Sequence, residues 1–204
     1  MGINFLALII LFVAAFADLL VPVVLGLKYP GYNHFLDTIS ILGAKGSPVK
    51  KQENLNLVMI GILLIVFSFL QRLAFTSSVW SHSLYTLGII VFGIGCIVAG
   101  IFPGRAKGVG ENFSGKIHDI ASGTGFIFFL FSPLWASFID VFAKYRAFNI
   151  IFFTIGIVSF ALFILSENKE TGLLKYTGLF QRLNLLVLYG CLLFNCAVLT
   201  IKNF

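Results

Sequence analysis

Hydrophobic residues run along this chain in six long stretches, and the segments between them hold most of the charged residues. Each stretch is about 20 residues long, which at roughly 1.5 Å rise per residue matches a hydrocarbon core about 30 Å thick. Backbone groups inside a bilayer must bond to one another, so stretches of this length predict helices. The predicted spans are residues 3–25, 55–75, 82–102, 117–139, 147–166 and 179–201.

Composition indicates a membrane protein and leaves no room for a separate soluble domain. Hydrophobic residues make up 59% of the 204 residues and charged residues only 11%, far from the values of globular proteins. The longest connection is the first loop, residues 26–54, so we expect a single transmembrane domain over 1–204. The fold class is an all-α membrane protein, a bundle of six transmembrane helices. The net charge of +6 suits loops beside lipid headgroups, and we expect no nucleic-acid partner.

Two residue types inside the spans predict local features. Pro22 and Pro133 should bend or locally open the first and fourth spans, because proline has no backbone N–H. Gly93 and Gly95 in the third span predict places where helices approach closely.

The charged residues are distributed unevenly between the two ends of the predicted bundle. Loops one (26–54), three (103–116) and five (167–178) share one end, and with their flanking turns they carry ten of the 14 Lys and Arg residues. By the positive-inside rule these loops face the cytoplasm, and we expect the protein in the cell membrane, meaning an inner or plasma membrane. Seven of the eight acidic residues and two of the three histidines also belong to this half. That gathering predicts a polar site at the loop one, three and five end.

Asp18 lies inside the first span, on the side of these loops. A charged residue at that depth costs a few kcal/mol on insertion scales, so we expect it to face the bundle interior beside a partner. Arg182 enters the sixth span at a similar depth, flanked by Gln181 and Asn184, and His118 is the other candidate partner. These residues are interpreted as candidate ligand-binding residues or, alternatively, as a structural pair that fixes helix packing.

The first loop contains a segment with helical amphipathic character. At 100° per residue, His34, Asp37 and Ser40 fall on one polar arc, with Asn33 as N-cap and Gly43 as a stop signal. The pattern predicts a short amphipathic helix near 34–42 at the membrane interface. Its polar face is interpreted either as part of a site or as a solvated surface.

His118 and Asp119 begin the fourth span at the same end of the bundle as His34 and Asp37. Two histidines and two carboxylates can divide acid and base roles, so these four and Ser40 are the candidate catalytic residues. Ser40 qualifies as a nucleophile only if a histidine nitrogen approaches its oxygen. No close ligand spacing such as H-x-x-x-H is present, so we expect neither a metal nor another cofactor. The helix dipole alone also explains an acid at position 119.

Loop three is rich in glycine and carries Arg105 and Lys107, two further candidate ligand-binding residues. A flexible basic loop can hold a phosphate headgroup, or it can be a connector whose charge sets topology.

Several segments together resemble the prokaryotic membrane family known as domain of unknown function 998. They are YPGY at 29–32, DTISILGA at 37–44, GSP at 46–48, GIFP at 100–103, the His118-Asp119 pair and GLFQR at 178–182. The resemblance covers nearly the whole chain. It implies a compact multi-helix membrane protein and implies no particular activity.

Three functions remain open from the sequence. The first is a site for an anionic, lipid-type ligand at the loop one, three and five face, with lipid binding or headgroup chemistry; whether the protein is an enzyme is undecided. The second is a non-catalytic accessory subunit of a larger membrane complex, with other membrane subunits as partners. The third is a small transporter, although spans two, three and five are nearly free of charge.

Overall fold

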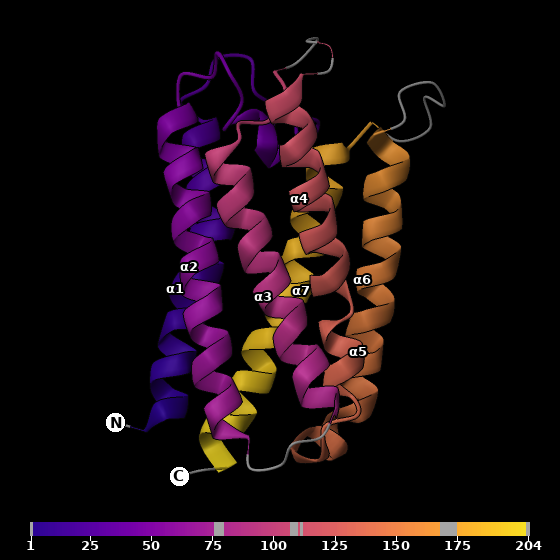
Figure 1. Ribbon diagram of the computed structural model, residues 1–204. Helices are drawn as coiled ribbons and strands as arrows, with labels where there is room; N and C mark the ends of the chain where they lie inside the picture. Colours follow the sequence, from indigo (N-terminus) through magenta and orange to yellow (C-terminus); the bar gives the residue numbers. More distant parts are fainter. Residues whose placement is uncertain (1, 76–79, 107–109, 111, 168–174, 203–204) are drawn as a thin grey trace.

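Six long apolar helices form an elongated bundle in the computed structural model, which describes residues 2–75, 80–106, 110, 112–167 and 175–202 (Figure 1). The long helices are α1 (Ile3–Gly26), α2 (Lys50–Ala74), α3 (Trp80–Ile101), α4 (Phe113–Leu130), α6 (Arg146–Glu167) and α7 (Thr177–Lys202). Short helices complete the described elements: η1 (Ile39–Ile41), α5 (Ser132–Ala136) and η2 (Asp140–Tyr145). Within the described residues, six segments are long and apolar enough to cross a membrane. The prediction of an all-α bundle with six spans is therefore confirmed.

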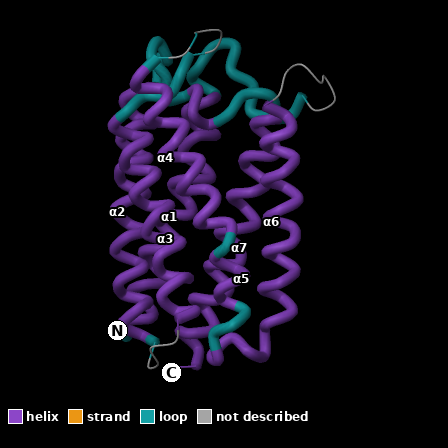
Figure 2. The backbone as a smooth tube through the Cα atoms, turned by 45° about the vertical axis from the view of Figure 1, so that its right-hand side comes forward, coloured by secondary structure: helices purple, strands orange, loops and turns teal. Residues whose placement is uncertain are grey.

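The fourth span is made of two helices. α4 ends at Leu130 and α5 begins at Ser132, with Pro133 in its first turn; Figure 2 shows the short loop between them. Proline suits the start of a helix because the N–H it lacks has no partner there. The predicted opening at Pro133 is confirmed, whereas α1 continues as one helix through Pro22.

α7 is the most buried of the spans. It contacts α1 and α6, while α1 contacts α2, α2 contacts α3 and α3 contacts α4. The predicted close approach at Gly93 is confirmed, since a Cβ there would lie 2.9 Å from the Gly61 carbonyl oxygen of α2. Both chain ends lie at one end of the bundle, opposite the first loop (Figure 1).

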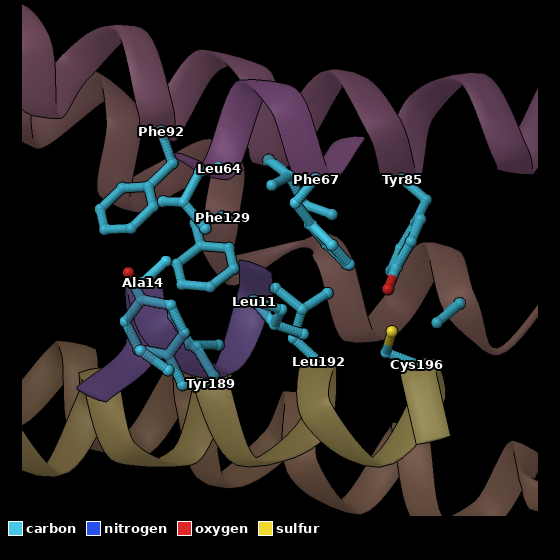
Figure 3. Close-up of a cluster of buried hydrophobic side chains, with 14 of the residues drawn as sticks. Leu11, Ala14, Leu64, Phe67, Tyr85, Phe92, Phe129, Tyr189, Leu192 and Cys196 are labelled. Carbon is cyan, nitrogen blue, oxygen red and sulfur yellow. The ribbon is translucent and has the colours of Figure 1, made fainter. Parts of the chain in front are cut away.

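The middle of the bundle is an apolar core. Figure 3 shows Tyr189 of α7 beneath Phe129 of α4, which in turn lies beside Phe92 of α3. The Phe92 and Phe129 rings stack with centroids 4.4 Å apart, and all three side chains are buried. Inside a bilayer this packing holds helices together through dispersion contacts, because lipid is as apolar as the core. This apolar core lies directly below the polar residues at the end of the bundle that carries the first loop.

The first loop is less helical than its pattern predicts. Residues 34–36 form a turn, and only Ile39–Ile41 are helical, as a single 3-10 turn. Asn33 does cap the turn, because its Oδ1 accepts from the N–H groups of Phe35 and Leu36. The Asp37 carboxylate in turn accepts a hydrogen bond from the Asn33 N–H at 2.9 Å. The carboxylate thus ends the turn instead of standing on the polar face of a longer helix, and the predicted continuous helix at 34–42 is corrected to these two short elements.

Candidate functional site

Arg182 fastens the first loop to the start of α7. Its Nη1 donates to the carbonyl oxygens of His34 at 2.8 Å, Asp37 at 3.2 Å and Gly178 at 2.9 Å, and its Nη2 donates to the Tyr32 hydroxyl. Among the described residues no carboxylate forms an ion pair with this guanidinium. The hydrogen-bond acceptors that the structure describes for this guanidinium are therefore all neutral.

Neighbouring residues of α7 complete this attachment. The Gln181 side chain accepts from the Ile39 N–H at 2.7 Å, and the Leu179 N–H donates to the Phe35 carbonyl at 3.0 Å. Gly178 permits the approach, since a Cβ there would lie 2.2 Å from the Asp37 carbonyl oxygen. The first loop is thus held over the end of the bundle by hydrogen bonds from its backbone to the Gln181 side chain and the Leu179 backbone of α7.

The same guanidinium affects two ionisable groups of the loop. Burial lowers the pKa of His34, and the Arg182 charge lowers it further, so His34 is neutral near pH 7. Burial raises the pKa of Tyr32, while Arg182 acts in the opposite direction. The His34 Nδ1 is buried without a hydrogen-bond partner.

Asp18 faces the bundle interior, as predicted, and is only 3% exposed. Its partner is a residue that the sequence does not single out: the Tyr189 hydroxyl donates to Asp18 Oδ2 at 2.9 Å. The predicted ion pair between Asp18 and Arg182 is not formed among the described contacts. The guanidinium points to the first loop, where backbone carbonyls satisfy its donors.

A small cavity brings together Asp18, Ser40, His118 and Gln181. The Nδ1 of His118 lies 3.0 Å from the Ala99 carbonyl oxygen and 3.1 Å from that of Phe102. Carbonyl oxygens only accept, so Nδ1 carries the hydrogen and Nε2 of the neutral ring is an acceptor. That Nε2 is buried and has no hydrogen-bond partner.

The other predicted site residues lie elsewhere. Arg105 pairs with Asp119 on the partly exposed surface of α4, an interaction worth about 0–1 kcal/mol. The Asn184 amide donates to the Gly156 carbonyl and the Ser159 hydroxyl of α6, both at 2.9 Å. Lys107 lies outside the described residues. The candidates therefore occupy the loop attachment, the cavity, the α4 surface and the α6–α7 contact, not one common cavity.

Glu53 is the buried carboxylate that sequence reasoning missed. It is 0% exposed, and neither of its oxygens has a hydrogen-bond partner. Its position in the first turn of α2, next to Lys50 and Lys51, is typical of a solvated helix start. Only its packing below the first loop distinguishes it from such a residue. Among the described residues, no three His, Cys, Asp or Glu side chains are grouped so as to hold a metal ion.

Comparison with known proteins identifies the family of this chain. No curated protein and no solved structure matches the chain. A family model matches residues 12–198, which include the loop attachment, the cavity and the core, and the chain therefore belongs to the family described as "Protein of unknown function (DUF998)".

Proposed function

We propose that this multi-pass membrane protein binds an anionic lipid between α1 and α7, with an acyl chain along the helices and the headgroup beside Arg182. The observation that supports this is a groove of about 450 Å³ on the outside of the bundle. Residues of α1 between Phe12 and Leu20 and of α7 between Leu179 and Leu193 line it, and Arg182 is the charged one among them.

The walls of the groove have the chemistry of an acyl-chain site. Phe12, Phe16 and Leu186 are each more than half exposed in the isolated chain. In a bilayer these side chains face hydrocarbon, so a chain lying between them gains dispersion contacts on two sides. The groove runs along the helices, as the acyl chains of a bilayer do.

The positive charge of Arg182 favours a lipid with an anionic headgroup. Its guanidinium has no ion-pair partner among the described residues, and its Nε is buried without a hydrogen-bond partner. A phosphate oxygen suits arginine, because the planar fork of donors matches phosphate geometry. With loops one, three and five in the cytoplasm, this headgroup would belong to the cytoplasmic leaflet of the cell membrane, where anionic lipids are enriched.

The proposal is one of binding and not of reaction. Within the described part of the chain, neither His34 nor His118 makes a hydrogen bond to the Ser40 hydroxyl. Nucleophilic activation of Ser40 requires such a contact. The groove also lies on the outer side of α1 and α7, whereas Ser40 and His118 line the inner cavity.

A groove-filling substitution tests the proposal. Leu20→Trp places a large ring in the groove, and Ile151→Trp, on the lipid-facing surface of α6, is the matched control. Native mass spectrometry of the purified protein should find retained anionic phospholipid in the wild type and in Ile151→Trp, and much less in Leu20→Trp. Equal lipid retention by all three proteins contradicts the proposal. Loss of a co-purifying membrane protein from Leu20→Trp, without loss of lipid, would favour the accessory-subunit alternative.

A further inference from the structure

A second polar site lies on the inner side of α1 and α7, separate from the lipid groove. Asp18 and His118 line a cavity in which a water molecule's centre has about 40 Å³ of space. A water molecule needs about 10–15 Å³ by this measure, so the cavity has room for roughly three water-sized groups. Ser40 and Ser122 also line it and are only partly buried, which places its outer edge near the bundle surface.

Two side chains of this cavity, Asp18 and His118, offer hydrogen-bond acceptors to a ligand. The Asp18 carboxylate has one described donor, the Tyr189 hydroxyl on Oδ2. His118 is 2% exposed, and its buried Nε2 has no partner; with the Nδ1 hydrogen directed at the Ala99 carbonyl, Nε2 is the acceptor in the neutral form of the ring. The Ser122 hydroxyl donates to the His118 carbonyl, so its own hydrogen is already used. A ligand complementary to this set is a donor of several hydrogen bonds.

The charge around the cavity favours a cation. Glu53 of α2 is a second fully buried carboxyl group near Asp18, and it has no hydrogen-bond partner. Arg182 attracts Glu53 through space, but it donates its hydrogen bonds to the first loop and forms no described ion pair. Among the described residues, no cationic side chain forms an ion pair with the Asp18 carboxylate that lines the cavity. A buried ion without a close partner costs several kcal/mol, and a bound cation removes that cost.

The apolar part of the lining suits an ammonium group. Phe92 of α3 and Phe126 of α4 line the cavity with their rings 5.5 Å apart. Aromatic rings attract cations, most strongly when water is excluded. A divalent metal fits poorly, because no described group of three ligating side chains is present.

We propose that the cavity lined by Asp18 and His118 binds a small primary ammonium cation, ammonium or methylammonium in size. The cation donates one hydrogen bond to Asp18 and one to Nε2 of His118. The first loop lies over the site through Ile39 and Ser40, which also line the cavity. This inference is independent of the lipid groove, since the two sites share no lining residue.

Methylammonium chloride titrated into the purified full-length protein tests the site by calorimetry and by thermal unfolding. The wild type should show saturable binding and a rise in unfolding temperature, and potassium chloride should not reproduce either effect. Asp18→Asn keeps the shape and can still accept from Tyr189, yet it should bind at least about tenfold more weakly, the equivalent of 1.4 kcal/mol. Asp140→Asn, on the exposed start of η2, should bind as the wild type does.

Three results would overturn the inference. They are the absence of saturable binding to the wild type, equal binding to Asp18→Asn, and an equal response to potassium. Infrared spectroscopy provides a further check that does not depend on ligand. A carboxylic acid carbonyl band at neutral pH that disappears in Asp18→Asn would mean that a proton occupies the place assigned to the cation, which also overturns it.

Discussion

Tyr189 of α7 donates a hydrogen bond of 2.9 Å to the Asp18 carboxylate of α1, and both side chains are buried. This contact takes the place of the expected pairing between Asp18 and Arg182. Arg182 instead donates its hydrogen bonds to the first loop, and its side chain also lines the groove between the same two helices. The cavity lined by Asp18 and the groove lined by Arg182 are thus two separate features of the same two helices.

Tyr189→Phe should destabilise the protein. It removes the described donor to Asp18 and leaves a buried acceptor, at a cost of about 1–3 kcal/mol. The measurement is the thermal unfolding temperature in detergent. Tyr145→Phe is the matched control, because the Tyr145 ring packs on Phe194 while its hydroxyl has no hydrogen bond among the described contacts. Equal unfolding temperatures of the two variants would show that the hydrogen bond to Asp18 contributes nothing.

Gly61→Ala should weaken the contact between α2 and α3. A Cβ at Gly61 would lie 2.3 Å from the Gly93 carbonyl oxygen, so the helices must move apart, with a loss of about 1–3 kcal/mol. Gly123→Ala in α4 meets nothing within 4 Å, and alanine's better helix propensity should leave it as stable as the wild type or slightly more so. Thermal unfolding of both variants gives the comparison. A smaller loss for Gly61→Ala than for Gly123→Ala would contradict the observed helix packing.

The free energy of unfolding should depend on pH through His34 of the first loop. Its pKa is lowered in the folded protein from 6.5, first by burial and then by the Arg182 charge. The unfolded chain therefore binds more protons than the folded one at pH values below about 6.5. The contribution of His34 to the free energy of unfolding is consequently lost as the pH falls. The unfolding temperature should drop more for the wild type than for His34→Gln between about pH 7.5 and about pH 5.5. Identical drops for both proteins would exclude this role of His34.

Gly178→Ala should detach the first loop from α7. The added methyl carbon would lie 2.2 Å from the Asp37 carbonyl oxygen and 2.9 Å from Arg182 Nη1, so the loop must move. Faster trypsin cleavage at the loop residues Lys28 and Lys45 is the expected readout. Gly156→Ala, whose new methyl would meet only leucine side chains at 3.1 and 3.4 Å, is the control and should be cleaved as slowly as the wild type.

The spans could be predicted from the sequence because bilayer thickness and backbone hydrogen bonding leave one solution for an apolar stretch of about 20 residues. The inward direction of Asp18 followed from the cost of a charge in lipid. The break at Pro133 followed from the missing N–H of proline. Each of these features depends on a local rule that a single residue or a single stretch satisfies.

The partners of the polar residues could not be predicted in this way. Arg182 is satisfied by backbone carbonyls, which every residue has and which no sequence pattern marks. Asp37 has helical spacing from His34, but its contact with the Asn33 N–H closes a turn and ends the expected helix early. Glu53 looks like an ordinary acid at a helix start, yet it is fully buried, with its Cγ 3.6 Å from where a Cβ of Gly43 in the first loop would lie. These outcomes depend on how distant segments pack.

The most direct measurement is the preference of the purified protein for an anionic over a zwitterionic phospholipid, compared between wild type and Arg182→Gln. Phosphatidylglycerol and phosphatidylcholine with the same acyl chains serve as the two lipids. Arg72→Gln, at the opposite end of the bundle, controls for a lost positive charge. Tyr32→Phe, which removes one neutral contact of the guanidinium, controls for a loosened first loop.

The wild type, Arg72→Gln and Tyr32→Phe should prefer phosphatidylglycerol by about tenfold or more, since a charge-assisted hydrogen bond contributes about 1.5–3 kcal/mol. Arg182→Gln should bind the two lipids equally. A wild-type protein without this preference, or an Arg182→Gln protein that keeps it, would contradict the assignment of the α1–α7 groove as an anionic-lipid site.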